Sequence, residues 1–354
     1  MTSPFAYFLQ QRKTSLNFIC LLIFSFFLTQ CQSDKGIPPA SDIAIDVKIK
    51  RFEQELFALE TQNSDLSFDA QVSELASKYP QFFEVFKELI ADAYGLDTSV
   101  VQRVRKFIEY EGVRQLYDTT QVLYNDIAWI EEELETVFKR YKTYFPEKPI
   151  PEVVSFISEY GVGTFTYGDS LLAIGWDFFL GEDFHYDYNV FPAFLQKSMD
   201  QEHLVAKAVE TLASNVMGEV YGNRLLDHMV ANGKTLYLKS LLLPDTKEEV
   251  LLEWHPEQLE WMQNNYNERE LWNQIVKRDL LYSTRRTEFD KLIVASPFGT
   301  TWMPRNSPGK AGNWIGWQIV KAYMKEHPET SVEELAAVED AQVILDGSRY
   351  RPGR

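Results

Sequence analysis

The stretch SPGKAGNWIGWQIVKAY, residues 307–323, decides how the C-terminal part of this chain folds. Gly312 and Gly316 are four residues apart, so in a helix they share one face and let a second backbone approach closely. Apolar and aromatic residues recur around this face: Trp314, Ile315, Trp317, Ile319, Ala322 and Tyr323. A helix that is apolar on nearly all sides is typical of a domain interior, so we expect a central helix here.

Helical periodicity extends over much of the remaining chain. Apolar residues recur at three- and four-residue steps over 127–141, which predicts a long amphipathic helix that the prolines at 146–151 end. Four further helices are expected at residues 203–217, 223–230, 256–282 and 313–325. Ser331 and Glu334 form a capping-box pattern, which predicts the start of a late helix.

Strand patterns are fewer and shorter. Isoleucine and valine alternate with other residues over 43–49, which predicts a half-buried strand. Two β-rich runs, 163–167 and 171–176, are joined by Gly168 and Asp169, which predicts a β-hairpin. The sequence therefore predicts a helix-dominated α+β fold, as a single domain with a small β-hairpin sheet.

Six of the eight tryptophans lie in the last third of the chain, which calls for an explanation: Trp254, Trp261, Trp272, Trp302, Trp314 and Trp317. They could line a groove that binds a sugar or a partner protein. Large aromatic side chains more often fill a core, because each buries a large apolar area. We therefore expect most of these side chains to be core residues.

The first 30 residues have the pattern of a lipoprotein signal peptide. Arg12 and Lys13 precede an apolar run of 11 residues, 18–28, which is too short for a stable membrane-spanning helix. The run ends in LTQC, residues 28–31, which looks like a bacterial lipobox, the type of signal in which the cysteine is diacylated. Acyl chains contribute ~0.8 kcal/mol per buried methylene, so a lipid on Cys31 would be a durable anchor. The alternatives are an ordinary secretory signal with a chance cysteine and an uncleaved anchor.

We therefore expect three segments: a lipoprotein signal peptide at 1–30, a lipid-anchored flexible tether at 31–42 and a globular domain at 43–354. The tether is expected because QSDKGIPPAS, residues 32–41, is polar and contains proline and glycine. Cys20 lies inside the signal, so Cys31 is the cysteine that the mature chain keeps. This leaves no disulfide and no thiolate metal site.

The net charge is −17, and removal of the signal leaves the mature chain two charges more negative, at −19. A chain this acidic is repelled by nucleic acids and by anionic lipid head groups. We therefore expect no nucleic acid partner, and a bilayer contact made through acylated Cys31.

The sequence lacks the strong signatures of a catalytic site. It contains no pair of histidines four residues apart with a glutamate beside the first, as in a zinc-protease helix, and no Gly-x-Ser-x-Gly turn. Glu202, His203 and Glu210 could offer metal ligands, because seven residues make two helical turns. A chance arrangement on an acidic helix is the more ordinary interpretation, so we expect no catalytic residue, no metal and no cofactor.

Several motifs in the chain resemble the gliding motility lipoprotein GldB family of Bacteroidota. The densest is the stretch at 307–323, and others are GKTLYLK at 233–239, LPD at 243–245, EW at 260–261, ELW at 270–272, LYS at 281–283, SPF at 296–298 and SRYRP at 348–352. Weaker matches near the start are IKRF at 49–52 and ELF at 55–57. The resemblance spans most of the mature chain and implies a lipid-anchored envelope protein that supports gliding, with a possible link to protein secretion.

The family is also similar, more distantly, to zincin-type predicted zinc proteases, and this implies a zincin-like scaffold. In that pattern Lys207 and Thr211 stand where the two metal-binding histidines would be, Ala208 where the general base would be, and Asn232 where the third ligand would be. A lysine repels a dication and an alanine cannot accept a proton. The resemblance therefore implies a degenerate metal site on a protein that is not an enzyme.

The sequence thus leads to one main function and two alternatives. The main interpretation is a non-catalytic, lipid-anchored scaffold or partner-binding protein that binds other motility or secretion proteins of the cell envelope. It is expected at the outer membrane, facing the periplasm. The alternatives are a metallopeptidase with an irregular site around His203, and a module that binds a peptide or glycan.

Overall fold

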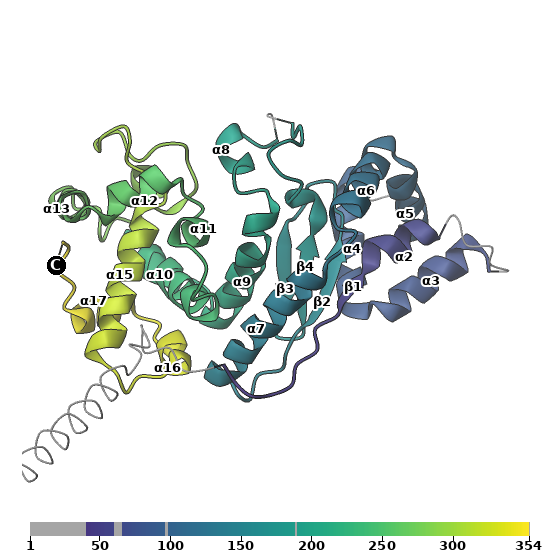
Figure 1. Cartoon of the computed structure of the whole chain (residues 1–354). Helices are drawn as coiled ribbons and strands as arrows, with labels where there is room; N and C mark the ends of the chain where they lie inside the picture. Colours follow the sequence, from purple (N-terminus) through teal and green to yellow (C-terminus); the bar gives the residue numbers. More distant parts are fainter. Residues whose placement is uncertain (1–39, 60–65, 96–97, 188–189, 354) are drawn as a thin grey trace, which may run out of the picture. The chain divides into compact units, whose positions relative to one another are not determined.

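The computed structural model describes residues 40–59, 66–95, 98–187 and 190–353. They belong to one compact unit that runs from Ala40 to Arg354 (Figure 1). The expected signal peptide, Cys31 and most of the expected tether lie outside the described residues. Helices dominate the unit and four strands form one sheet, so the predicted helix-dominated α+β class is confirmed.

The four strands are arranged in the order β1-β2-β4-β3. Their bounds are β1 Ile49–Arg51, β2 Glu152–Phe156, β3 Thr164–Tyr167 and β4 Leu171–Gly175. β1 and β4 both run parallel to β2, and β3 runs antiparallel to β4. The predicted hairpin is therefore confirmed as β3 and β4. It forms one side of a larger sheet, because β4 is buried along its whole length and β3 lies at the edge.

Helices cover both faces of the sheet. A phenylalanine-rich core packs on Val154, Phe156 and Leu171 of one face. It comes from α2 (Phe52–Ala58), α3 (Phe68–Lys78), α4 (Pro80–Tyr94), α5 (Val100–Glu109) and α6 (Glu111–Leu123).

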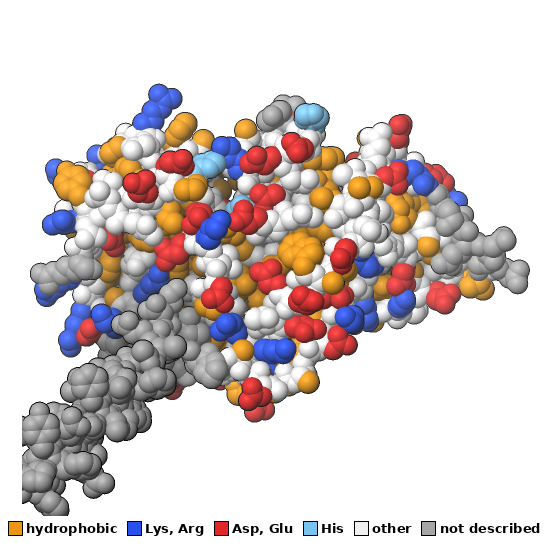
Figure 2. All heavy atoms as spheres, in the orientation of Figure 1, with side chains coloured by type: hydrophobic (Ala, Val, Ile, Leu, Met, Phe, Trp, Pro, Cys, Tyr) orange, Lys and Arg blue, Asp and Glu red, His pale blue; other side chains and the backbone are white. Residues whose placement is uncertain are grey.

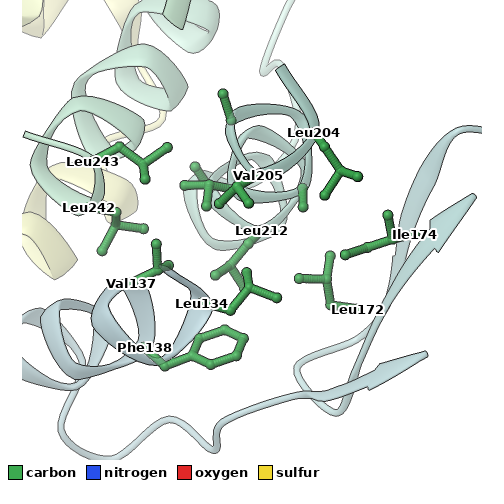
Figure 3. Packing of buried hydrophobic residues seen from close by; sticks show 14 of the residues in the cluster. Leu134, Val137, Phe138, Leu172, Ile174, Leu204, Val205, Leu212, Leu242 and Leu243 are labelled. Carbon is green, nitrogen blue, oxygen red and sulfur yellow. The ribbon is translucent and has the colours of Figure 1, made fainter. Parts of the chain in front are cut away.

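On the opposite face, α7 (Ala128–Tyr144) and α9 (Gln201–Met217) bury Leu172 and Ile174 of β4. Figure 3 shows Leu134 and Phe138 of α7 directed toward these two strand residues. The predicted amphipathic helix over 127–141 is thus confirmed as α7. Between β4 and α9, the chain forms a short 3-10 helix, η1 (Trp176–Phe178), and α8 (Ala193–Gln196).

The C-terminal helices form a further core beside α9. They are α10 (Leu225–Leu242), α11 (Glu248–Leu252), α12 (Pro256–Gln263), α13 (Asn265–Lys277), α14 (Arg286–Ile293), α15 (Ala311–Glu326), α16 (Val332–Ala337) and α17 (Ala341–Ser348). The six tryptophans of this region all pack in or against this core, as expected.

The predicted central helix is confirmed as α15, which packs closely against α10. A Cβ atom added to Gly316 would lie 1.7 Å from the Met229 carbonyl oxygen of α10. One added to Gly233 of α10 would lie 2.4 Å from the Gly316 carbonyl carbon. Backbones can approach this closely only where glycine omits the side chain, so both glycines fix the crossing of the two helices.

Three predicted elements are wrong in extent. The helix expected over 223–230 continues to residue 242 as α10, because Leu236, Leu238 and Leu242 extend its buried side. Residues 43–48 are not a strand. The Val47 amide N–H donates to the Glu135 side chain of α7, and strand pairing begins at Ile49, the first residue of β1. The helix expected over 256–282 is two helices, α12 and α13. The chain breaks at Asn264, whose side chain accepts a hydrogen bond from the Tyr266 amide and caps the second helix.

Candidate functional site

Five charged residues, named here the lysine–glutamate cluster, join four helices: Lys207, Glu210, Lys239, Glu253 and Lys310. Lys207 and Glu210 lie on α9 and Lys239 on α10, while Glu253 directly follows α11 and Lys310 directly precedes α15. Lys207 Nζ is 2.7 Å from Glu253 Oε1, and Lys310 Nζ is 3.2 Å from Glu253 Oε2. One carboxylate therefore bridges two ammonium groups.

The bridge connects two unusual backbone positions. Glu253 has a φ of 55° and Lys310 a φ of 58°, so both adopt the left-handed conformation that side chains other than those of glycine and asparagine rarely adopt. The Glu253–Lys310 ion pair joins the end of α11 to the start of α15 across these two turns. The surrounding ion pairs are thus part of what holds two strained turns in place.

A second ion pair of the cluster connects α9 to α10. The Lys239 side chain is fully buried, and its Nζ donates to Glu210 Oε2 at 2.6 Å and to the Leu251 carbonyl at 2.8 Å. Glu210 retains 38% of its side-chain exposure, so its other face contacts solvent. A buried ammonium is tolerated because both of these acceptors compensate for its lost hydration.

The charged forms of Glu253 and Lys207 are both favoured by their neighbours in the cluster. Burial favours the neutral form of Glu253, but the positive charges of Lys310, Lys207 and Lys239 outweigh it and hold the pKa of this carboxyl below its usual range. Burial also opposes the charge of Lys207, yet Glu253 and Glu210 raise the pKa of its ammonium. The Lys207–Glu253–Lys310 trio therefore carries one excess positive charge, while the Lys239–Glu210 pair is neutral.

A groove runs along the free edge of the sheet, between β3 and α9. It has a volume of about 680 Å³, and Thr164, Thr166, Lys207 and Thr211 are among its lining residues. The two hydroxyl groups of Thr164 and Thr211 are 2.6 Å apart, so β3 and α9 are hydrogen-bonded to each other. The groove thus has a strand edge on one side and a helix on the other.

The register of the hairpin determines which backbone groups face this groove. Gly175 N–H donates to the Gly163 carbonyl at 2.7 Å, and Phe165 pairs with Ala173 in the same register. Because hydrogen-bonded and non-hydrogen-bonded pairs alternate, the N–H and C=O groups of Thr164 and Thr166 point away from β4. No strand pairs with this edge among the described residues.

A smaller cavity of about 210 Å³ lies between α9, α10 and α15. Lys310 and Glu210 are its charged residues, and its uncharged polar lining comes from Ser214, Asn232, Thr235 and Asn313. Asn232 Nδ2 donates to Asn313 Oδ1 at 2.8 Å, and Asn313 Nδ2 donates to the Ile293 carbonyl at 3.1 Å. These two bonds orient both amides at the cavity wall. Glu210 and Ser214 also line the groove, so the two spaces are adjacent.

The four positions of the predicted degenerate site all have structural contacts. Lys207 pairs with Glu253, Thr211 is hydrogen-bonded to Thr164, and Asn232 is hydrogen-bonded to Asn313. Ala208 is fully buried in the core between α9 and the sheet. In the part of the chain that the structure describes, no three His, Cys, Asp or Glu side chains come together as metal ligands.

The alternative ligand set around His203 is not brought together. His203 Nδ1 is 2.7 Å from Asp200 Oδ1, the residue that caps α9, while Glu202 lies 3.5 Å from Lys247 and Glu210 pairs with Lys239. Seven residues of a helix rise by about 10 Å, so His203 and Glu210 are two turns apart. These three side chains therefore do not converge on one ion.

A further cleft, of about 830 Å³, lies at the N-terminal end of α9 and extends to α12. His203, Glu253, His255 and Lys310 line it together with further acidic and basic residues. In Figure 2, acidic, basic and histidine side chains gather around the hollow between the positions of α8 and α12. Trp254 and Lys310 line both this cleft and the smaller cavity.

Sequence reasoning missed Lys239, Glu253 and Lys310. Lys310 ends SPGK in a turn directly before α15, and its ammonium forms an ion pair with Glu253. Lys239 ends the GKTLYLK motif in the last turn of α10, among leucines, and these apolar neighbours are the signal that could have marked it as buried and paired.

The fold and the site thus define a helix-dominated α+β domain whose partly buried lysine–glutamate cluster lies beside an open sheet edge. Among its described helices, none is long and apolar enough to cross a membrane. The chain belongs to the family of the gliding motility protein GldB, a lipoprotein family whose model matches residues 33–352. This confirms the resemblance to that family. Compared with curated proteins and with solved structures, the chain has no match.

Proposed function

We propose that this protein is a lipid-anchored envelope component of gliding motility that acts by binding another envelope protein, without catalysis. The main observation concerns the four positions that correspond to the catalytic residues in the zincin pattern. That pattern requires three metal ligands and a general base at these positions. Lys207, Ala208, Thr211 and Asn232 occupy them, and each is engaged in packing, an ion pair or a hydrogen bond. A metal-binding helix needs free donor atoms at these positions.

The groove along β3 is the binding surface in this proposal. Thr164 and Thr166 offer outward N–H and C=O groups, which match the spacing of an extended peptide that adds a strand to the sheet. The groove lining is mostly polar, which suits a peptide with polar side chains. The partner is therefore an extended segment of another motility or secretion protein of the envelope.

Lipid attachment through Cys31 supports the same role. A chain with a net charge of −17 has little electrostatic attraction to an anionic bilayer, so acylation would hold it at the membrane. The proposed location is the outer membrane, with the domain facing the periplasm. There the groove would be within reach of other envelope proteins.

Complementation in a gliding host tests this proposal. Deletion of the gene should abolish colony spreading, and the wild-type gene should restore it. A Thr166→Pro variant removes one outward N–H from the groove and should fail to restore spreading, although proline is tolerated on an edge strand. A Thr166→Val variant keeps the N–H and a similar shape, so it should restore spreading.

Two results would overturn the proposal at different levels. A deletion strain that still spreads excludes the role in motility. Full spreading with Thr166→Pro, at a normal level of folded protein, excludes the strand edge as the partner-binding surface. Loss of spreading with a Cys31→Ala variant is expected from the lipid anchor.

A further inference from the structure

We propose that the 210 Å³ cavity between α9, α10 and α15 is a carboxylate-binding site centred on Lys310. This site is distinct from the strand edge at Thr166, and its existence does not depend on the motility function. The ligand class is a monoanionic carboxylate, either the C-terminus of a peptide or an aspartate or glutamate side chain.

The first argument is the charge balance of the cluster. Glu253 is shared by Lys207 and Lys310, and Lys207 is the nearer of the two, at 2.7 Å compared with 3.2 Å. Lys207 is further stabilised by the charge of Glu210. Lys310 is therefore the less neutralised ammonium, and its side chain retains only 20% of its exposure, so water compensates for little of its charge.

The second argument is the chemistry of the cavity wall. Asn232 and Asn313 bring amide groups to the cavity, and Ser214 and Thr235 bring hydroxyl groups. Each of the two amide nitrogens already donates one N–H within the protein, and the Thr235 hydroxyl donates to the Ala231 carbonyl. The second N–H of each asparagine and the Ser214 hydroxyl therefore remain as donors beside Lys310. Glu210, the acidic residue of the wall, is neutralised by Lys239 at 2.6 Å. Leu236, Leu251 and Trp254 supply the apolar part that would contact the carbon atoms of a ligand.

The third argument, from charge balance and volume, favours a carboxylate over a phosphate as the ligand. The trio has one excess positive charge, which a carboxylate balances completely. A phosphate dianion would leave a net negative charge next to Glu210 and Glu253 in a partly buried space, where like charges interact strongly. The volume is about seven times the ~30 Å³ share of a water molecule, which accommodates a carboxylate group with a short carbon chain.

Saturation-transfer NMR with small probes tests the site in the mature chain, made with Cys31→Ser so that no lipid is attached. N-acetylglycine represents a peptide C-terminus, and the N-methylamide of N-acetylaspartate represents an acidic side chain. At least one of the two should show saturable binding, and inorganic phosphate at the same ionic strength should bind more weakly. The probe that binds better identifies the source of the carboxylate.

Two variants assign the binding to the cavity. Lys310→Asn removes the charge while asparagine tolerates the left-handed backbone, and it should weaken carboxylate binding at least tenfold. Thr235→Leu fills the cavity and should weaken binding without changing any charge. Lys247→Gln is the matched control, because it removes an exposed lysine at the mouth of the larger cleft and should leave binding unchanged.

The proposal is overturned if neither carboxylate probe binds saturably, or if phosphate binds more tightly than both. It is also overturned if folded Lys310→Asn and Thr235→Leu proteins bind as the wild-type protein does. These outcomes are separate from those of the motility test, because they are measured on purified protein and do not involve the strand edge.

Discussion

Gly233 of α10 and Gly316 of α15 face each other where the two helices cross, and neither position has room for a methyl group. A Cβ atom on Gly316 would lie 1.7 Å from the Met229 carbonyl oxygen, which is backbone and cannot rotate away. The crossing also brings Asn232 of α10 to Asn313 of α15, and the two side chains are hydrogen-bonded at 2.8 Å. The polar site is therefore built on a contact between two glycines.

Replacing Gly316 with alanine should destabilise the protein by about 1–3 kcal/mol, which is the usual cost of overpacking a core. Urea unfolding monitored by tryptophan fluorescence measures this change. The direction of the change in the free energy of unfolding is informative. Alanine at a helix position without steric conflict stabilises a helix by about 1 kcal/mol relative to glycine, so only a steric conflict explains a loss of stability. An unchanged or increased free energy of unfolding would show that the two backbones are not in close contact.

The sequence predicts this helix crossing better than it predicts the polar site. Gly312 and Gly316 are local features, and each does meet a backbone closely. They meet two different helices, however, because Gly316 contacts Met229 of α10 and Gly312 contacts Leu292 of α14. The hairpin was predictable for the same reason, from Gly168 and Asp169 between two β-rich runs. Local patterns determine both elements.

The lysine–glutamate cluster was not predictable in this way. Glu253 and Lys310 are far apart in the sequence, and each lies in a turn whose local pattern does not reveal its partner. The strand expected over 43–49 failed for a related reason. Its alternating pattern is real, but the Val47 amide donates to Glu135 of α7, and pairing with a neighbouring strand, β2, begins only at Ile49.

The Lys239–Glu210 ion pair should respond asymmetrically to mutation. Glu210→Ala leaves a fully buried ammonium without its counter-ion, which should cost about 3 kcal/mol. Lys239→Met leaves a carboxylate that is 38% exposed and can be hydrated, so its cost should be about 1–2 kcal/mol, mainly from the unpaired Leu251 carbonyl.

Chemical unfolding of both variants and of the double variant measures this asymmetry. The double variant should cost less than the sum of the two single changes, because each single change leaves a partner unpaired. The proposed buried and coupled pair would be contradicted if Glu210→Ala cost no more stability than Lys239→Met. It would also be contradicted if the cost of the double variant equalled the sum of the two single costs.

Asp177 should make the stability depend on pH. The carboxyl is fully buried, and burial raises its pKa to about 6, although the Tyr160 and Ser158 amide N–H groups donate to Oδ2. A folded-state pKa above the unfolded value of 3.8 means that the folded protein binds the proton more tightly. The contribution of Asp177 to the free energy of unfolding is therefore complete below pH 4 and is lost as the pH rises through 6.

Asp177→Asn removes this titration while its amide oxygen still accepts the two backbone hydrogen bonds. Relative to wild type, the variant should therefore gain stability between pH 4 and pH 7, by about 3 kcal/mol at most. The free energy of unfolding of both proteins at each pH gives the difference directly. A difference that does not change with pH would show that Asp177 has the same pKa in the folded and unfolded states.

Metal removal should have no effect if the proposed non-catalytic role is correct. Lys207 and Thr211, at the positions of the two histidines in the zincin pattern, form an ion pair and a hydrogen bond with other residues of the chain. An ammonium group at a metal position repels a dication, so residues 32–354, purified without the lipid, should contain far less than one equivalent of metal. Its melting temperature should be the same in zinc and in chelator. About one equivalent of bound metal, with a melting temperature that falls in chelator, would contradict the non-catalytic role and favour the peptidase alternative.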